Sequence, residues 1–455
     1  LRPLGCGAPG ALHRPRPVGI KPLYYTDVGG VFYFASEAKA LLAIPGFVRR
    51  LNRRALSLYL TFRYTPGEET LFDGIRKLPP GHTLTVSPGG VRRLRRYWQL
   101  VFEPDEEPDE DQWAERFREV FTEAVRLRLI SDVPLGAYLS GGLDSSLIVA
   151  AMSELSGAPV DAFSVGFRDE RFSELPYARE VAERFGCRHH VLHAEEEAGA
   201  LLPQVIWHLD EPLGDLATIP TYLMARETKP HVTVVLSGEG ADELLAGYPK
   251  YRAFLLGQRL APLLPAAAWS GAARLAQNTA AGRVLGSLAR ADRPGAYLEL
   301  ASVFGAAERG GLLTQEGRRE MLAEAEIEDF VRPFFARESD GLSQLLDLDF
   351  HTWLPDDLLL KNDRMTMAHA VEARVPYLDH KLVELCARIP SRFKLRWHQE
   401  KVLLRKVMAG RLPERIRRRK KRGFTVPLGA WREGSFGRQM DAVLGEDFIR
   451  RQGLF

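Results

Sequence analysis

Apolar and polar residues change their spacing several times along this chain, and each change predicts a different kind of element. Between residues 133 and 237, short apolar runs alternate with segments in which apolar residues recur every three or four positions. The runs predict strands and the periodic segments predict helices. Strands separated by helices pair in parallel, and such a sheet binds ligands at the carboxyl ends of its strands. The expected strands are Leu135–Ser140, Ala162–Phe167, His189–His193 and Val232–Ser237; the expected helices start near Asp144 and cover Leu175–Phe185, Leu201–Leu209 and Ile219–Glu227.

Residues 19–100 show a different pattern, with short β-rich runs and little helical periodicity. Pro22–Thr26 and Val31–Ala35 flank the turn sequence Asp-Val-Gly-Gly, which predicts a hairpin. Two more strands are expected within Leu78–Val86 and Val91–Trp98. Ser36–Leu42 has the composition of a short helix that begins at a Ser cap.

The segments around these two regions are less regular. The first 18 residues hold four prolines and three glycines without periodicity, so we expect a disordered leader at 1–18. Residues 101–112 include the acidic run EPDEEPDED, which predicts a solvated linker. Residues 251–350 and most of 356–412 are expected to be helical. A helix is also expected after the linker, from apolar residues at spacings of three and four: Trp113, Phe117, Val120, Ala124 and Leu127.

Composition narrows the class of protein. The 455 residues are 45% hydrophobic and 27% charged with a net charge of +3, which is typical of a soluble globular protein and favours neither a nucleic-acid nor a membrane partner. Three widely spaced cysteines fit neither a disulfide framework nor a zinc site, so we expect a reducing, cytoplasmic location. No apolar run approaches the ~18 residues of a membrane span.

The sharpest motif is Leu139-Ser-Gly-Gly-Leu-Asp-Ser-Ser146, in which two glycines separate an expected strand from an expected helix. Glycines let backbone N–H groups approach an anion closely, and the helix N-terminus adds partial positive charge. Asp144 would repel a bare anion, so it makes chemical sense beside a bridging metal ion such as Mg²⁺. Without a Lys-Ser/Thr ending, the motif is not a Walker loop. A glycine turn that merely caps a helix is the non-functional alternative.

A second loop, Ser237-Gly-Glu-Gly-Ala-Asp-Glu243, follows another expected strand. The first motif is similar to the pyrophosphate loop of ATP pyrophosphatases, and with the second the chain resembles the glutamine-dependent asparagine synthetases. Further stretches match this family in order from residue 19 to the end. They are GIKPLYY from Gly19, FASEAKALL from Phe34, LPDDLLLKNDRMTMA from Leu354, VEARVPYLD from Val371 and KKRGFTVPL from Lys420.

The resemblance implies two domains. Residues 113–455 would form a Rossmann-like α/β synthetase domain of the adenine nucleotide alpha hydrolase type, with its pyrophosphate loop at 140–146. Residues 19–100 would be the partial, β-rich remnant of an N-terminal-nucleophile αββα glutaminase domain that lacks its active site. In the family, a Cys-Gly at the very N-terminus carries the nucleophile. Here five residues precede Cys6 and twelve separate it from Gly19, so we expect no glutaminase activity and a chain that is truncated at both ends.

The implied reaction is the amidation of aspartate in two steps. The β-carboxylate attacks the α-phosphorus of ATP to give β-aspartyl-AMP and pyrophosphate, and ammonia then displaces AMP to give asparagine. Two anions must be aligned and their charge neutralised. ATP and Mg²⁺ are the expected cofactors, and the nitrogen would come from free ammonia, or from glutamine in longer relatives. We expect neither a nucleic acid nor a membrane as a partner. The expected assembly is a homodimer.

Matching positions give the expected site. Asp144 and Asp242 match the family's Mg²⁺ ligands, and Glu239 matches a residue that acts in forming the acyl-adenylate. Lys421 matches a lysine that contacts the phosphates, and Arg364 a basic residue near the nucleotide. Contacts to ATP and pyrophosphate are expected at Leu139, Ser140, Gly141, Gly142, Asp144, Ser145, Ser146, Val165, Ser237 and Gly238.

Several alternatives stay open. The chain could be an amide-forming or cyclising ligase for another carboxylate in specialised metabolism, although relatives that close β-lactam rings carry Tyr at the position of Glu239. It could also be a non-catalytic remnant. An RNA-thiolating enzyme is a more distant option, because the basic run Arg415–Arg422 lacks interleaved aromatic residues. Three histidines on one expected strand, His189, His190 and His193, lack a companion ligand motif, which favours packing over metal binding.

Overall fold

The computed structural model describes residues 11–13, 17–87, 92–167, 169, 171–194, 200–276, 279–419, 421, 423 and 426–455. Cys6 lies outside the described residues, so the structure gives no test of its predicted lack of function. By internal contacts the chain divides into two compact units. Unit 1 consists of Leu1–Phe102, Tyr248–Asp356 and Glu446–Phe455, and unit 2 of Glu103–Gly247 and Asp357–Gly445. These units are discontinuous in sequence, whereas the division expected at 18, 100 and 112 is linear and stays a prediction.

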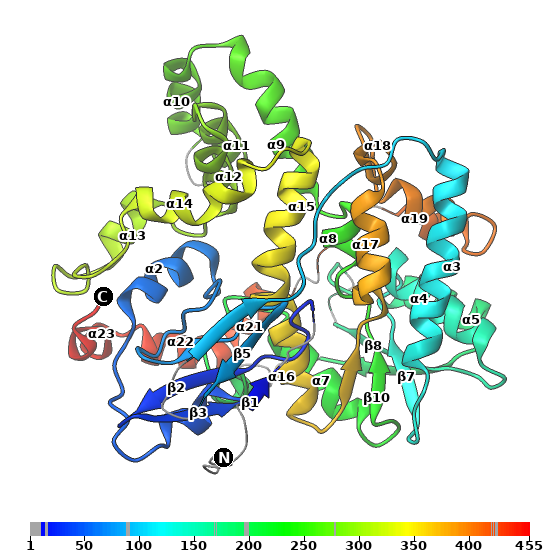
Figure 1. Ribbon diagram of the computed structural model, residues 1–455, viewed down its shortest axis with the longest axis horizontal. Helices are drawn as coiled ribbons and strands as arrows, with labels where there is room; N and C mark the ends of the chain where they lie inside the picture. The colour runs from blue at the N-terminus through cyan, green and yellow to red at the C-terminus, as the bar shows by residue number, and fades with distance from the viewer. Residues whose placement is uncertain are drawn as a thin grey trace. The chain divides into compact units, whose positions relative to one another are not determined.

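A parallel five-stranded sheet forms the centre of unit 2, as the alternation of strands and helices predicts (Figure 1). Its strand order is β11-β10-β7-β8-β9, and all neighbouring pairs are parallel. Successive strands extend from β7 first to one side and then to the other, so the order reverses between β7 and β10. A crevice for ligands opens at the carboxyl ends of the strands at such a point. The strands are β7 (Leu135–Tyr138), β8 (Asp161–Gly166), β9 (Arg188–His193), β10 (Val234–Leu236) and β11 (Glu372–Arg374).

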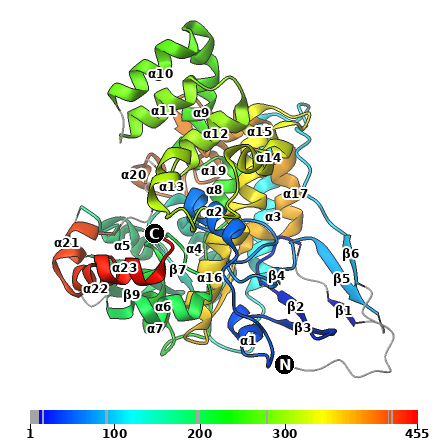
Figure 2. The same cartoon turned by 90° about the vertical axis from the view of Figure 1, so that its left-hand side faces the viewer.

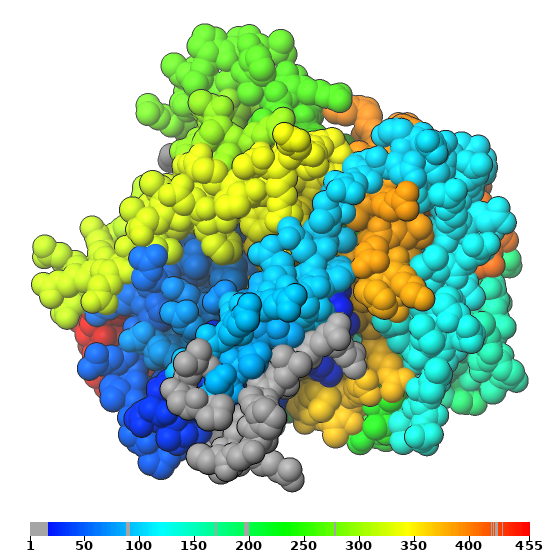
Figure 3. Space-filling view, viewed as in Figure 1, coloured from blue at the N-terminus to red at the C-terminus, as the bar shows by residue number. Residues whose placement is uncertain are grey.

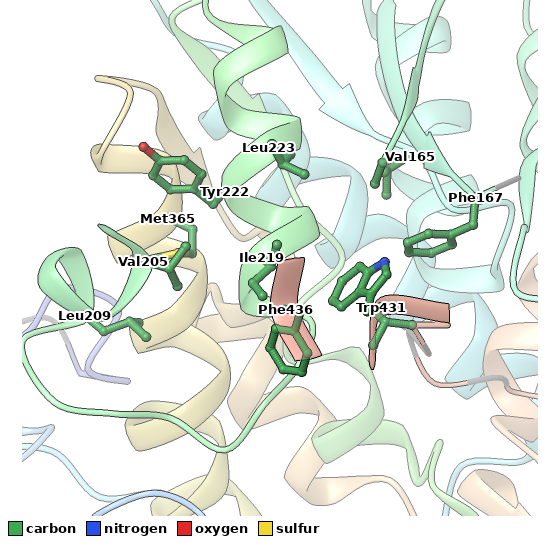
Figure 4. Packing of buried hydrophobic residues seen from close by; sticks show 12 residues of the cluster. Val165, Phe167, Val205, Leu209, Ile219, Tyr222, Leu223, Met365, Trp431 and Phe436 are labelled. Atoms are coloured by element: carbon green, nitrogen blue, oxygen red, sulfur yellow. The ribbon is translucent and has the colours of Figure 1, made fainter. Parts of the chain in front are cut away.

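Helices connect these strands and cover the sheet. A buried apolar cluster joins β8 to several of them, with Val165 and Phe167 packed against Trp431 and Ile219 (Figure 4). Full burial of a side chain of this size stabilises a fold by about 1.5–3 kcal/mol. The helices of unit 2 are α3 (Glu110–Arg128), α4 (Leu143–Leu155), α5 (Leu175–Arg184), α6 (Leu202–Leu209), α7 (Thr218–Thr228), α8 (Ala241–Leu245), α16 (Leu360–Met367), α17 (His380–Arg388), α18 (Ser391–Lys394), α19 (Val402–Val407), α20 (Glu414–Arg417), α21 (Leu428–Glu433) and α22 (Ser435–Val443), with the 3₁₀ turn η4 (Pro376–Leu378) and the short hairpin β12 (Leu395–Arg396) and β13 (Gln399–Glu400).

The structure of α3 differs slightly from the helix expected from the sequence. The helix begins after Asp109, whose side chain forms a capping box with Gln112. Trp113, Phe117 and Ala124 are buried as expected, but Leu127 is 45% exposed. Phe121 completes the buried stripe instead, because the face that packs inward follows a spacing of four residues.

Acidic residues of the linker expected at 101–112 form ion pairs with three arginines. Arg388 contacts Asp105 at 2.7 Å, Arg392 contacts Glu106, and Arg396 contacts Glu110 at 2.6 Å. The three arginines are spaced by four residues. Exposed pairs of this kind each contribute at most about 1 kcal/mol, but together they fix where the segment runs.

Two small antiparallel sheets form the β-rich part of unit 1, in the orders β3-β2-β4 and β1-β5-β6. The expected hairpin is present: Gly29 and Gly30, with φ of +60° and +79°, turn the chain between β2 and β3. β1 lies within the segment expected to be a disordered leader and pairs with β5. The strands are β1 (Ala11–His13), β2 (Tyr24–Val28), β3 (Val31–Ala35), β4 (Arg76–Lys77), β5 (His82–Val86) and β6 (Arg92–Arg96).

Helices complete unit 1. The expected helix after Ser36 begins at Ala38, with Glu37 at the cap position. α9 to α12 project away from the strands of their own unit, which both views show (Figures 1 and 2). No helix in the described part of the chain is long and apolar enough to cross a membrane. The helices are α1 (Ala38–Leu42), α2 (Arg53–Phe62), α9 (Pro249–Leu260), η2 (Ala261–Leu263), α10 (Ala266–Leu275), α11 (Ala280–Leu288), α12 (Arg293–Ala301), α13 (Ala306–Leu312), α14 (Glu324–Phe335), α15 (Gly341–His351) and α23 (Glu446–Gln452); the π-helical segment η3 (Leu354–Leu359) follows α15.

Candidate active site

The first expected loop follows β7 and leads into α4. Leu139 extends the strand pairing, because its N–H donates to the carbonyl of Phe163 (2.8 Å). Gly141 has a φ of +71°, and a Cβ there would lie 2.5 Å from the backbone nitrogen of Ala178. Only glycine tolerates both the conformation and the close approach. Gly142 then occupies the N-cap of α4, so the two glycines turn the chain from strand to helix.

Serine hydroxyls hold the shape of this loop. The Oγ of Ser145 accepts a hydrogen bond from the N–H of Ser140 (3.2 Å), and the Oγ of Ser140 accepts one from the N–H of Gly142 (3.2 Å). Ser146 is fully buried in α4, and its hydroxyl has no hydrogen-bond partner among the described residues. Ser140 and Ser145 line a cavity beside this loop, whereas Ser146 does not.

The second loop follows β10 and closely approaches the first. The N–H of Ser237 donates to the carbonyl of Arg374 (2.8 Å), which extends the pairing with β11. A Cβ on Gly238 would lie 3.1 Å from the Cβ of Asp144, so a larger residue would push the loops apart. Gly240 has a φ of +93° and begins α8. The loops meet because β7 and β10 are neighbours at the point where strand order reverses.

Two lysines bridge the carboxylates of Asp144 and Asp242. The Nζ of Lys401 lies 2.5 Å from the Oδ1 atom of each carboxylate. The Nζ of Lys421 lies 2.6 Å from the Oδ2 of Asp242 and 3.7 Å from the Oδ2 of Asp144. Both carboxylates are therefore within reach of a single cation.

The charges of this cluster support one another. Burial disfavours the ionised form of Asp242, but the ammonium groups of Lys401 and Lys421 outweigh burial and lower its pKa to about 2. Burial also opposes the charge of Lys421, and here Asp242 and Asp144 outweigh it, so the pKa of Lys421 is raised. Asp242 and Lys421 thus stay charged around neutral pH.

Glu239 lies between two glycines in the second loop, close to another lysine. Burial raises the pKa of Glu239, although Lys361 and Lys421 oppose the shift. Lys361 of α16 contacts Asp215 at 2.6 Å. Burial opposes the charge of Lys361, but Asp215 and Glu239 outweigh it and raise its pKa. A carboxylate with a raised pKa is a better proton acceptor than an exposed one.

These side chains surround one cavity of about 200 Å³ within unit 2. One part of its lining is apolar, and the other carries the carboxylates and ammonium groups described above. Such a division suits a ligand with a flat ring at one end and phosphate groups at the other. The apolar part consists of Tyr138, Leu139, Phe163, Val165, Ala217 and Met224.

Most of the residues expected from the sequence meet at this cavity, namely Leu139, Ser140, Asp144, Ser145, Val165, Ser237, Gly238, Glu239, Asp242 and Lys421. Gly141 does not line it. Gly142 lines a smaller neighbouring cavity together with Lys401 and Arg419.

Arg364 is placed away from the cavity. Its side chain is buried on α16 and contacts Asp210 at 3.4 Å. Lys361, three residues earlier, lines the cavity instead. The expected position of Arg364 rests on the family resemblance alone, and its role near the nucleotide stays a prediction.

Sequence reasoning missed Lys361, Lys401 and Arg405. Lys361 lies inside a stretch that matches the family, which was an available signal. Lys401 belongs to no motif recognised in the sequence, and it is far along the chain from Asp144. Only the fold shows that the two side chains are in contact. Arg405 of α19 is buried, and its role also depends on tertiary contacts.

Arg405 ties together the segments that carry the two bridging lysines. Its guanidinium donates to the carbonyl oxygens of Glu400 (2.8 Å), Arg417 and Arg419 (2.9 Å). Glu400 directly precedes Lys401, and Arg419 lies two residues before Lys421. One buried side chain therefore holds both lysine-bearing segments.

Part of the basic run is also fixed in place. Arg419 pairs with Glu174 and lies over the ring of Tyr177, with its Cζ 4.0 Å from the ring centroid. Its guanidinium also donates to the carbonyl of Gly141 (3.4 Å). These contacts place Arg419 against the first loop rather than in solvent.

Two histidines of β9 make polar contacts, and one of them also stacks on an aromatic ring. The Nε2 of His189 lies 2.8 Å from the Oγ of Ser164, and burial lowers the pKa of His189. His190 contacts Asp161 at 2.9 Å and stacks on Phe163. Among the described residues, no group of three or more His, Cys, Asp or Glu side chains is arranged to hold a metal ion.

The chain matches the models of two protein families and is similar in sequence to several known proteins. The model of the asparagine synthase family matches residues 116–455, and that of the glutamine amidotransferase domain matches residues 10–98. The glutamine-hydrolyzing asparagine synthetase 1 of Bacillus subtilis is 35% identical over 95% of this chain and 70% of its own length. A putative asparagine synthetase of Mycobacterium tuberculosis is 33% identical over 91% of this chain and 64% of its own length. The amidase chyE of Penicillium rubens is 28% identical over 96% of this chain and 70% of its own length.

Proposed function

The chain belongs to the asparagine synthase family, and on that premise we propose that unit 2 uses ATP to convert the β-carboxylate of aspartate into an amide. The observation that carries the proposal is the meeting of two glycine loops at the reversal of strand order. There, Asp144 and Asp242 face each other across Lys401, and Glu239 lies beside Lys361 and Lys421.

The cavity offers a place for each part of ATP. Its apolar lining, which includes Leu139 and Val165, suits the adenine ring. The backbone of the first loop and the N-terminus of α4 suit the phosphates, because both present N–H groups to an anion. Lys401 and Lys421 add positive charge next to this loop.

Asp144 and Asp242 also fit Mg²⁺. Carboxylate oxygens are ligands that Mg²⁺ prefers, and one ammonium nitrogen already lies within 2.5 Å of both side chains. Two carboxylates and two ammonium groups sum to zero charge, so a divalent cation held there would supply the positive charge that a triphosphate requires.

The remaining residues have roles in the two chemical steps. When an oxygen of the substrate carboxylate bonds to the α-phosphorus, the bond from phosphorus to the bridging oxygen breaks and pyrophosphate leaves; Lys421 is placed to stabilise the negative charge that builds up. When ammonia bonds to the acyl carbon, the bond to the AMP oxygen breaks and the nitrogen loses a proton. Glu239, whose pKa is raised by burial, is placed to accept that proton.

A second candidate is amidation of a different carboxylate. The relation to the amidase chyE supports it, because that protein is related over nearly the whole chain. Glu239 supports aspartate as the substrate, since cyclising relatives carry Tyr at that position. For the nitrogen donor we propose ammonia, either free or released from glutamine, because the model of the glutamine amidotransferase domain matches residues 10–98.

The test is an assay of the purified chain with ATP, Mg²⁺, ammonium and a panel of carboxylates. Formation of AMP, pyrophosphate and asparagine with aspartate supports the proposal. Turnover of only another carboxylate would replace aspartate with that substrate, and a comparison of ammonium with glutamine identifies the nitrogen source. Asp144→Asn should abolish pyrophosphate release. If calorimetry detects no ATP binding, the chain is a non-catalytic remnant and the proposal fails.

A further inference from the structure

Unit 1 contains a second cavity, which shares no residue with the proposed active site. Its volume is about 210 Å³, and every residue that lines it belongs to unit 1. It lies where the turn between β4 and β5 and the residues after β6 meet α14, α15 and the start of η3. Figure 3 shows the yellow helical segments lying against the blue β-rich segments of this unit.

The backbone around this cavity is rigid. Five prolines line it: Pro17, Pro22, Pro79, Pro80 and Pro355. Gly81 has a φ of +69°, and a Cβ there would lie 2.4 Å from the carbonyl oxygen of Trp98. Because proline fixes φ and Gly81 has no room for a side chain, the backbone here has few alternative conformations.

Aromatic rings form much of its wall. The ring centroids of Trp98 and Phe350 are 6.3 Å apart, and those of Phe350 and His351 are 5.3 Å apart. Phe334 lies next to His351, at 6.1 Å. Rings at these separations present flat, polarisable faces that favour a planar guest.

A buried lysine lies in the same wall. Lys77 is only 8% exposed, and its ammonium donates to the carbonyl of Thr65 and to Asp356 (2.8 Å). The other carboxylate oxygen of Asp356 accepts the N–H of Gly67 (2.8 Å). An ammonium has three N–H donors, and described residues accept only two of those of Lys77. The third is available to an acceptor inside the cavity.

Arg96 at the rim adds a charge that no carboxylate of the described residues balances. Its guanidinium donates to the amide oxygen of Gln99 (2.6 Å), and its Nε approaches His82 at 3.4 Å. By contrast, the nearby Arg337 pairs with Asp347. The cavity therefore combines aromatic walls, a spare N–H donor and an excess of positive charge.

We propose that this cavity binds a small carboxylic acid that contains one planar ring. The carboxylate would accept hydrogen bonds from Lys77 and Arg96, and the ring would lie against Trp98 and Phe350. The volume is below the range of about 300–1,000 Å³ that holds drug-sized ligands, which limits the guest to a single ring.

Phenylacetate is the probe for this site, and its binding to the full chain can be measured by isothermal calorimetry and by ligand-observed NMR. Arg96→Gln should weaken binding by about tenfold, because it replaces a charged hydrogen-bond donor with a neutral one. Arg95→Gln is the matched control, since its side chain leaves β6 on the opposite face and it does not line the cavity. Neither variant changes the nucleotide loops, so ATP binding should be unchanged in both.

Neutral phenylacetamide and ring-free acetate should each bind at least tenfold more weakly than phenylacetate. Lys77→Met should also abolish binding, but this change leaves Asp356 unpaired and can unfold the chain. Arg96→Gln therefore carries the test, because Arg96 is exposed. The proposal is overturned if the unaltered chain does not bind phenylacetate, if Arg96→Gln and Arg95→Gln bind it equally, or if inorganic phosphate binds more tightly than phenylacetate.

Discussion

At Gly141 the backbone leaves no room for a side chain. A Cβ would lie 2.5 Å from backbone atoms of Ala178 and Tyr177, and the φ of +71° is unfavourable for other residues. We expect Gly141→Ala to destabilise the chain by about 1–3 kcal/mol and to reduce pyrophosphate release. Gly157→Ala is the control, because nothing lies within 4 Å of its would-be Cβ. Equal melting temperatures for the two variants would show that the loop relaxes freely.

The charge of Asp242 links stability to pH. Its pKa in the folded chain, about 2, lies below the usual value near 3.9, so its ionisation stabilises the fold above about pH 4 and this stabilisation is lost as the pH falls towards 2. Lys401→Met removes one of the two ammonium groups responsible. We expect the free energy of unfolding to fall by about 3 kcal/mol at neutral pH and to depend less on pH between 2 and 4.

Lys406→Met is the control for this prediction. Lys406 lies on α19, the helix that Lys401 caps, but pairs with Asp111, whose side chain is 85% exposed, so its removal should change stability little. Urea unfolding at a series of pH values measures both variants. If the free energy of unfolding depends on pH in the same way for Lys401→Met and for the unaltered chain, the assigned role of Lys401 is contradicted.

Among the elements, the segment from α19 to Lys421 depends on one guanidinium. Arg405 donates to three backbone carbonyls from three different nitrogens of its planar guanidinium. A lysine has a single nitrogen and cannot reproduce this geometry. We expect Arg405→Lys to lower kcat about tenfold through misplacement of Lys421, with a smaller change in KM for the carboxylate substrate. Arg418→Lys, at a side chain that is 75% exposed, should have no effect. Equal losses in kcat and in folded fraction would indicate a purely structural role.

The sequence predicts elements well where one local rule decides them. Short apolar runs indicated four of the five strands of the parallel sheet, and glycines indicated both loops, because backbone conformation leaves a trace in residue type. The fifth strand, β11, lies in a stretch expected to be mostly helical. Contacts between distant segments leave no such trace. Lys401 reaches Asp144 only after the sheet has formed, and Arg364 pairs with Asp210, which lies 154 positions away in the sequence.

For the whole molecule, two units with separate cavities imply separate responses to ligands. A ligand that binds only the folded form stabilises it, by about 2.7 kcal/mol at a hundred times its Kd. We expect ATP with Mg²⁺ to raise the transition of unit 2 in scanning calorimetry, and phenylacetate to raise that of unit 1. A single transition that both ligands raise equally would show that the units unfold together. The homodimer and the cytoplasmic location stay predictions, and sedimentation analysis would test the first.

The discontinuous make-up of unit 2 has a consequence for synthesis on the ribosome. β10 leaves the ribosome long before β11, its partner, because residues 248–356 lie between them. At about 5–20 residues per second, the stretch between β10 and β11 takes roughly 7 to 27 seconds to synthesise. Throughout this time, the apolar edge Val234–Leu236 has no strand to pair with on that side, and such edges promote aggregation. The nascent chain therefore passes through a vulnerable interval in which a chaperone that covers exposed strand edges would raise its yield.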